Sequence, residues 1–182
     1  SEHELACRMS YILWGGPPDK ALAKAADQGE LYDPKGVESH IDRMLKDPRA
    51  VDRSSQFLSQ WLNLDRLQNM RPNADKFPEW DASFAEDMKA ETLAFFKDLA
   101  WDQRRPLADL LNAQFTYTTP RLAKHYNLGA ETASEGLQRV SLEDDAARGG
   151  ILTQGSLLTM GGDDASMVTR GLFVLHDLLR SG

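Results

Sequence analysis

The spacing of apolar side chains predicts a chain made mainly of amphipathic helices. In residues 3–14, apolar residues recur at steps of three and four, the period that places side chains on one face of a helix. The run Gly-Gly-Pro-Pro at residues 15–18 then ends this first helix, because proline and glycine both disfavour its continuation. The apolar face consists of Leu5, Met9, Ile12 and Leu13.

Aspartates mark where the next helices begin. Asp19 can cap a helix that ends before Gly29. The pairs at residues 33–34 and 47–48, each an Asp followed by a Pro, open two more helices. We expect the fourth helix to reach about residue 69 and to be buried on more than one side, since its apolar face is unusually wide. This face comprises Val51, Phe57, Leu58, Trp61, Leu62, Leu64 and Leu67.

The second half of the chain predicts one long helix with shorter elements around it. Pro72 and Pro78 bracket Phe77 in a rigid loop that we expect to lie on the surface of the bundle. The long helix 81–102 follows and places Glu91 beside its apolar face. The remaining expected elements are a helix at 107–111, an extended segment at 115–118, a helix at 121–126, a hairpin that pairs 137–142 with 150–152, a helix at 154–159, and a helix at 166–180 that buries Val168, Leu172, Leu175 and Leu179.

These elements predict a mainly α fold, a helical bundle of about seven or eight helices with at most a small two-stranded hairpin. We expect an N-terminal helical subdomain at 1–70, a central helical subdomain at 71–128, and a hairpin-like loop with C-terminal helices at 129–182. The three regions are expected to pack as one globule, because 182 residues are close to the usual size of one domain.

Composition and charge narrow the classes of function. The chain has 41% hydrophobic and 27% charged residues, a balance typical of a soluble globular protein. Its net charge of −7 disfavours a nucleic-acid partner, because phosphate binding relies on clustered Lys and Arg. No stretch approaches the ~18 apolar residues that a transmembrane helix needs, so we expect no membrane insertion.

A lone cysteine limits metal and haem chemistry in this chain. Cys7 can form neither an internal disulfide nor the Cys-x-x-Cys-His motif that attaches a c-type haem. His3 shares a helix face with Cys7, but a structural zinc site needs four ligands. We therefore expect no metal here, an exposed His3 and a packed Cys7 thiol.

The strongest polar cluster lies on one predicted helix, where Arg121, His125 and Tyr126 could bind an anion or a haem propionate. Alternatively, His125 and Tyr126 are half-buried and form hydrogen bonds to the neighbouring extended segment. Arg148 precedes two glycines whose backbone N–H groups could bind an anion beside the guanidinium. A hairpin turn is the alternative interpretation of that segment.

Met160 and His176 are the residues that could serve as axial ligands of a non-covalent haem. The alternative is that both are ordinary core or surface residues. The run Gly-Gly-Asp-Asp at residues 161–164 lacks the ligand pattern of a calcium loop and is interpreted as a helix cap.

Of the carboxylates in the chain, we expect Glu91 and Asp65 to lie nearest to apolar surface. Two such groups with different pKa values could act as a catalytic acid and base. The alternative is structural: an ion pair between helices, with Arg66, Arg121 or Arg170 as the cation.

Blocks of residues in a fixed order carry a family resemblance over nearly the whole chain. They are 4–6 with 8–14, 57–58 with 61–62 and 64–65, 91–92 with 95–96, 110–113 with 115–117, 122–123 with 125–126, 148–154 with 156 and 158–159, and finally 170–171, 174–175 and 178–179. In these blocks the chain resembles large multidomain proteins of unknown function, first noted in planctomycetes, whose domains accompany c-type cytochrome modules in exported proteins.

This resemblance implies a helical scaffold from the centre of a longer, exported redox protein, located in the periplasm or outside the cell. It implies no cofactor within this chain and a c-type haem elsewhere in the full-length protein. The partner would be a haem-bearing module of the same polypeptide or complex, and the scaffold would support electron transfer. We expect no activity of this chain alone; any activity would be associated with an oxidoreductase. The chain departs from the family pattern at Thr119, Met167 and His176, where the family often has Asn, Pro and an acid.

Two further functions follow from the residues themselves. The four Trp residues and the cluster at Arg121, His125 and Tyr126 are compatible with a small-molecule or glycan-binding module. Alternatively, the chain is an enzyme that uses Glu91 with Asp65 or His125 as acid and base.

Overall fold

The structure is a computed structural model of the 182-residue chain, and it describes residues 1–128, 136–143, 147–159 and 166–179. In these ranges the chain is mainly helical and contains one two-stranded antiparallel sheet, as predicted. The chain divides into two compact units, residues 1–58 and 59–182, and each is described by itself.

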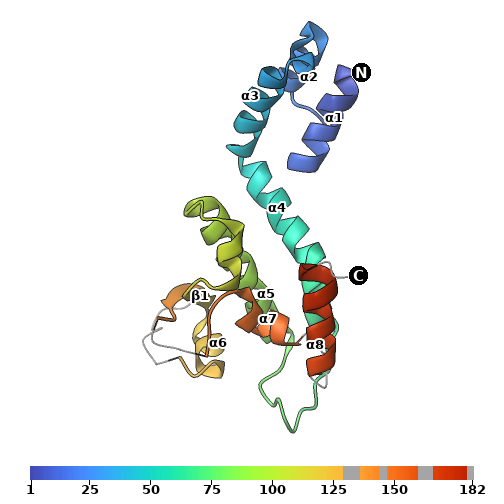
Figure 1. Ribbon diagram of the computed structural model, residues 1–182. Coiled ribbons are helices and arrows are strands. Elements are labelled where there is room, and N and C mark those ends of the chain that lie inside the picture. Colours follow the sequence, from blue (N-terminus) through green and yellow to red (C-terminus); the bar gives the residue numbers. More distant parts are fainter. Residues whose placement is uncertain (129–135, 144–146, 160–165, 180–182) are drawn as a thin grey trace. The chain divides into compact units, whose positions relative to one another are not determined.

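The first unit contains three helices and the start of a fourth (Figure 1). They are α1 (Glu2–Leu13), α2 (Lys20–Gln28), α3 (Pro34–Leu45) and α4 (Pro48–Trp61), with a short 3-10 turn, η1 (Glu30–Tyr32), between α2 and α3. The predicted caps are present: Asp19 accepts a hydrogen bond from the N–H of Leu22, and Asp33 from that of Lys35. Gly29 ends α2 in the left-handed conformation, with φ of 79°.

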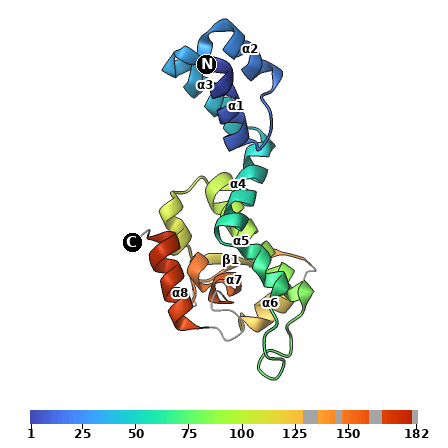
Figure 2. The same ribbon diagram turned by 90° about the vertical axis from the view of Figure 1, so that its right-hand side faces the viewer.

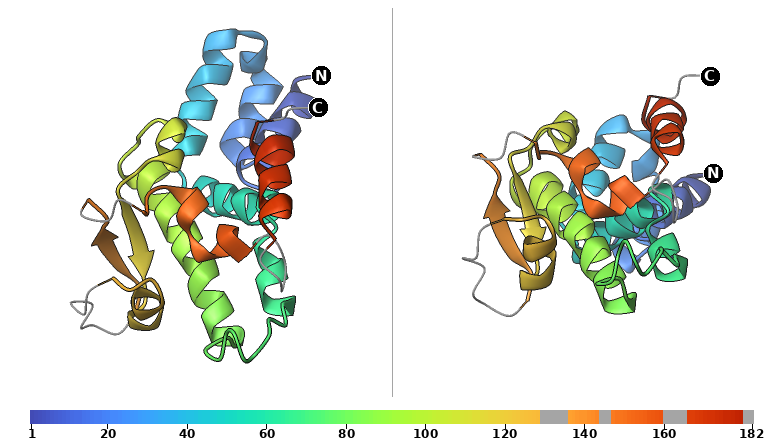
Figure 3. Two further views of the ribbon diagram at one scale, coloured as in Figure 1. Left: turned by 60° about the horizontal axis from the view of Figure 1, so that its bottom comes forward. Right: turned by 90° about the horizontal axis from the view of Figure 1, so that it is seen from below.

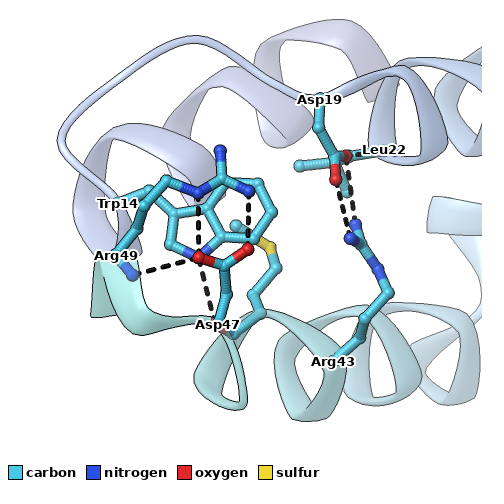
Figure 4. A network of polar contacts seen from close by, with 7 residues as sticks. Trp14, Asp19, Leu22, Arg43, Asp47 and Arg49 are labelled. Atoms are coloured by element: carbon cyan, nitrogen blue, oxygen red, sulfur yellow. Dashed lines mark hydrogen bonds and ion pairs between the residues drawn. The ribbon is translucent and has the colours of Figure 1, made fainter. Parts of the chain in front are cut away.

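Polar contacts surround Trp14 and join the helices of the first unit (Figure 4). The indole N–H of Trp14 donates to the carbonyl of Met44 at 3.0 Å, and the guanidinium of Arg49 lies 3.6 Å from the centre of the Trp14 ring. Arg49 is itself held by Asp47, whose pKa these hydrogen bonds lower to about 2. The guanidinium is therefore fixed over the ring in a cation–π contact.

The fourth helix ends earlier than the sequence predicts. Helix α4 stops at Trp61, Asn63 adopts a left-handed conformation with φ of 47°, and a 3-10 helix, η2 (Leu64–Asn69), follows. The expectation that α4 is buried on more than one side is wrong, because Phe57 is 59% and Trp61 37% exposed. The wide apolar pattern combined the residues of two separate elements, α4 and η2.

In the second unit the long helix α5 (Ala82–Lys97) lies against the sheet and the shorter helices (Figures 2 and 3). Asp81 caps α5 by accepting from the N–H of Phe84 at 2.7 Å, and a π-helical turn, η3 (Asp98–Asp102), extends the helix to the predicted end. The other helical elements are η4 (Leu107–Leu111), α6 (Pro120–His125), η5 (Ile151–Thr153), α7 (Gly155–Leu158), α8 (Met167–Phe173) and the π-helical turn η7 (Val174–Leu178).

The sheet forms between strands other than the expected pair. Strand β1 (Phe115–Thr118) pairs with β2 (Gln138–Ser141) in antiparallel register, with Phe115 opposite Ser141. The predicted hairpin between 137–142 and 150–152 is wrong, because residues 151–153 form a 3-10 turn. The side chains of β1 are buried or partly buried, and β1 contacts α5 as well as β2. This buried position favours the pairing of β2 with β1.

The C-terminal helix is far more exposed than predicted. Ser166 caps α8 by accepting from the N–H of Thr169. However, the four residues predicted to be buried are exposed by 73%, 48%, 46% and 65%: Val168, Leu172, Leu175 and Leu179. The helical spacing of these four apolar residues therefore produces an exposed apolar face and does not indicate burial in a core.

The side chains of Cys7 and His3 both lie on the surface. The thiol of Cys7 is exposed, which corrects the predicted packed environment, and His3 is exposed beside Asp27 at 3.3 Å. Within the described ranges, no cluster of three or more His, Cys, Asp or Glu side chains could hold a metal ion. No described helix is long and apolar enough to cross a membrane.

Candidate functional site

Glu91 lies at the centre of a buried hydrogen-bond network in the second unit. It projects from α5 and is 0% exposed. One carboxyl oxygen accepts from the hydroxyl of Thr116 on β1 at 2.6 Å, and the other accepts from the phenol of Tyr126, directly after α6, at 2.6 Å. The carboxyl group thus joins three elements that are distant in sequence.

The network continues beyond these two partners. The phenol oxygen of Tyr126 accepts from the backbone N–H of Gly155 at 2.6 Å, and Gln154 donates to the Thr116 hydroxyl at 3.4 Å. The guanidinium of Arg148 lies 3.9 Å from the centre of the Tyr126 ring. A Cβ atom at Gly155 would lie 2.7 Å from the Tyr126 phenol oxygen, so glycine allows the backbone to approach this closely.

Burial dominates the ionisation of this network. Desolvation raises the pKa of Glu91 to about 7, although the hydrogen bonds from Thr116 and Tyr126 and the charge of Arg148 favour the ionised form. Burial and the adjacent Glu91 raise the pKa of Tyr126 well above its ordinary value. The geometry therefore combines a carboxyl group that titrates near neutral pH with a phenol that stays protonated.

The structure does not assemble the predicted acid–base pair. Asp65 is exposed and forms an ion pair with Lys89 at 2.7 Å. Among the described residues, no hydrogen bond or ion pair joins His125 to Glu91. The cavity beside Glu91 has a volume of only about 10 Å³, about enough for one water molecule. A substrate could reach Glu91 only if the surrounding elements separated.

The alternative ion pair of Glu91 is not formed either in the described part of the chain. Arg121 binds Asp81, at 2.9 Å, and Arg66 donates to the carbonyl of Ser156. Glu91 does have polar partners beside the apolar face of its helix, but neutral hydroxyl groups supply these contacts. Hydroxyl donors satisfy a carboxyl group whether it is protonated or ionised.

The cluster of Arg121, His125 and Tyr126 is divided between two sites. Tyr126 is buried and faces Glu91, whereas His125 is exposed and packs edge-on against Phe84, with ring centres 5.0 Å apart. The guanidinium of Arg121 lies 4.8 Å from the centre of the Phe84 ring and binds Asp81. The expected hydrogen bonds from His125 and Tyr126 to the extended segment are not formed among the described residues.

The backbone N–H groups that follow Arg148 form hydrogen bonds within the protein. The N–H of Gly149 donates to the hydroxyl of Thr153 at 3.0 Å, and that of Gly150 donates to the carbonyl of Ala113 at 2.9 Å. Arg148 donates to the carbonyl of Thr153 at 3.1 Å. The predicted anion-binding arrangement is therefore occupied by internal contacts.

Of the two candidate haem ligands, Met160 and His176, the structure describes only His176. Met160 and the run 161–164 lie outside the described residues. His176 is exposed on the π-helical turn after α8 and lines a hollow with Trp61 and Phe173.

A second cavity, which the sequence interpretation did not anticipate, opens beside the N-terminal half of α5. We call it the aromatic cavity; it has a volume of about 270 Å³ and brings the loop before α5 together with α6. Phe84 forms its buried base, and Trp80 packs edge-on against Phe84 with ring centres 6.1 Å apart. Its lining residues are Lys76, Phe77, Pro78, Glu79, Trp80, Phe84, Met88, His125 and Thr159.

The sequence feature that could have indicated this cavity is the loop bracketed by Pro72 and Pro78. Its aromatic residues were expected to lie on the surface of the bundle, and Trp80 does pack against a buried cluster that includes Phe84, Met88 and Tyr126. The position of His125 opposite this loop depends on how α6 folds back, which no local pattern indicates.

Comparison with known proteins identifies a family whose function is unknown. A family model described as PSD4, protein of unknown function (DUF1592), matches residues 1–128. No curated protein and no solved structure matches the chain. The matched residues include Glu91, Tyr126 and most of the lining of the aromatic cavity.

Proposed function

We propose a function on the premise that the chain belongs to the PSD4 family of proteins of unknown function (DUF1592). The chain acts as a helical scaffold of an exported redox protein, in the periplasm or outside the cell. It packs against a haem-bearing module of the same polypeptide or complex and so supports electron transfer to another partner. The resemblance in sequence to cytochrome-associated proteins suggests the identity of this module.

The apolar surface of the C-terminal helix carries this proposal. Val168, Leu172, Leu175 and Leu179 follow helical spacing and are exposed by 46% to 73%. Met167, at the start of α8, is 77% exposed. A contiguous exposed apolar surface on a protein is a common mark of an interaction site, because water contact with it is unfavourable.

The proposal assigns the haem to another module. A single cysteine cannot supply the two thiols of a Cys-x-x-Cys-His site, so this chain cannot attach a c-type haem covalently. Its own residues would contribute the contact surface and hold the module in place.

Absorption spectra test the cofactor assignment. We expect a Soret band, in oxidised and reduced states, for a longer protein that contains this chain, and no such band for the chain alone. A longer protein that is purified without haem would contradict the proposal.

A matched pair of charge substitutions tests the surface. Val168→Asp places a carboxylate on the apolar surface of α8, and Leu107→Asp places one at a residue that is 62% exposed elsewhere in the second unit. We expect Val168→Asp to weaken binding of the haem-bearing module by about tenfold, because burial of a charge in the contact is costly. Leu107→Asp should leave binding unchanged; equal effects of both variants would contradict the proposed surface.

The aromatic cavity favours a second candidate function, a small-molecule-binding module. Ligand sites are typically concave and apolar with a few polar groups, and this cavity combines three aromatic side chains with Lys76 and His125. A thermal-shift panel of aromatic compounds and oligosaccharides tests it, because a bound ligand stabilises the folded state. A panel without any shift would remove this candidate.

A further inference from the structure

The walls of the aromatic cavity select for a flat ring. Phe84 is 2% exposed at its base, Phe77 is 39% exposed at its edge, and Trp80 packs edge-on against Phe84. Such surfaces bind planar rings through stacking and edge-to-face contacts. A volume of about 270 Å³ lies just below the usual range for drug-sized ligands, so it suits a molecule of one or two rings.

The polar groups of the cavity differ in whether they have partners. The carboxylate of Glu79 lies 3.7 Å from the ammonium of Lys124. The hydroxyl of Thr159 donates to the carbonyl of Gly155 at 2.9 Å. These two groups are therefore engaged within the protein.

Lys76, His125 and the indole N–H of Trp80 remain as available donors on the cavity wall. Among the described residues, neither the ammonium of Lys76 nor the imidazole of His125 forms a hydrogen bond or an ion pair. Partial desolvation by the surrounding protein lowers the pKa of His125, so its ring is neutral at pH 7 and still offers one N–H. A ligand that satisfies these donors must carry an acceptor, and the charge of Lys76 favours an anionic one.

Cationic ligands are disfavoured at the same place. The guanidinium of Arg121 already lies 4.8 Å from the centre of the Phe84 ring and is bound to Asp81. A cationic ligand in the cavity would be repelled by the ammonium of Lys76.

We propose that the aromatic cavity binds a planar aromatic carboxylate of one or two rings. The ring lies against Phe77, Trp80 and Phe84, and the carboxylate accepts from Lys76 and His125. This inference rests on the second function proposed above, and it names the ligand class that the small-molecule module takes.

Indole-3-carboxylate and its neutral counterpart indole-3-carboxamide form the matched pair of probes. We titrate each into the ¹⁵N-labelled chain and follow the backbone amide signals. We expect the carboxylate to shift the signals of residues 76–88 and 125, and to bind about fivefold more tightly than the carboxamide at low salt.

Two variants locate the contacts. Lys76→Met removes the exposed ammonium and should abolish the preference for the carboxylate, whereas Lys35→Met, at another exposed lysine, should preserve it. Trp80→Leu should weaken both probes, because both rely on the aromatic wall. The amide spectra of the variants confirm that the fold is intact.

The outcomes separate this inference from the function on which it rests. Equal binding of carboxylate and carboxamide, unaffected by Lys76→Met, would overturn the anion preference and leave a small-molecule module. Binding of cellobiose at the cavity with no binding of either indole would overturn the inference in favour of a glycan module. If none of the three compounds shifts any signal, both the inference and the small-molecule function are wrong.

Discussion

The phenol of Tyr126 donates a 2.6 Å hydrogen bond to the carboxyl group of Glu91, and both side chains are buried. This contact joins the end of α6 to the middle of α5. Because Tyr126 also accepts from Gly155, one phenol links three segments of the second unit. The stability of this unit should therefore depend on both residues.

Glu91 should make the protein less stable as pH rises from about 4.5 to about 7. In this interval the unfolded chain loses the Glu91 proton, whereas the folded chain retains it because its pKa is raised to about 7. The folded state then binds more protons than the unfolded state, so the free energy of unfolding decreases by roughly 3 kcal/mol across the interval.

The variant Glu91→Gln isolates this effect. We expect urea unfolding at a series of pH values to show the decrease in the wild type relative to Glu91→Gln. The contribution of His125, whose lowered pKa acts in the opposite direction, is present in both proteins and cancels. Parallel pH profiles for the two proteins would contradict the raised pKa of Glu91.

Removal of the Tyr126 hydroxyl should destabilise the second unit. Tyr126→Phe leaves the buried N–H of Gly155 and one oxygen of Glu91 without this partner, at a cost of about 2 kcal/mol. Tyr32→Phe is the control, since Tyr32 is 79% exposed, and it should change stability by less than about 0.5 kcal/mol. Urea midpoints with unchanged slopes measure both values; an unshifted midpoint for Tyr126→Phe would refute the expectation.

Asp19 combines a helix cap with an ion pair, and two substitutions separate them. Its carboxylate accepts from the N–H of Leu22 at 2.9 Å and from Arg43 at 2.7 Å and 3.1 Å (Figure 4). Asp19→Asn keeps a good cap and should cost about 0.5 to 1 kcal/mol, the usual range for partly exposed pairs. Asp19→Ala also loses the cap and should cost about 1 kcal/mol more.

The pH dependence of the Asp19 variants gives a further check. Arg43 lowers the pKa of Asp19, so the advantage of the wild type over Asp19→Asn is complete above the ordinary pKa. It should disappear as the pH falls through the lowered pKa, when the carboxylate becomes protonated. Thermal unfolding of both proteins measures this difference, and a constant advantage down to strongly acidic pH would contradict the ion pair.

Two helical glycines should respond to alanine in opposite ways. An added Cβ at Gly36, in α3, would collide with the backbone carbonyl of Glu30, so Gly36→Ala should destabilise the first unit by about 1 to 3 kcal/mol. An added Cβ at Gly171, in α8, meets no atom within 4 Å, so Gly171→Ala should be neutral or stabilising by up to about 1 kcal/mol. Circular dichroism melts decide the sign; stabilisation by Gly36→Ala would contradict the contact.

The sequence by itself determined where most helices begin. Asp19, Asp33, Asp81 and Thr119 each accept a hydrogen bond from an N–H two or three residues further along. These contacts involve only neighbouring residues, so local pattern is sufficient to predict them. The mainly helical class followed for the same reason, because helical periodicity is also a local property.

The tertiary structure alone decided which distant groups meet. The strand at 138–141 pairs with 115–118 and not with the nearer segment 150–152, because β1 lies beside α5. Glu91 finds the hydroxyl groups of Thr116 and Tyr126, where a sequence pattern suggested a cation. Apolar spacing in α8 predicted burial, yet burial depends on what covers the helix. Contacts of this kind depend on the packing of whole elements, and no short stretch of sequence encodes them.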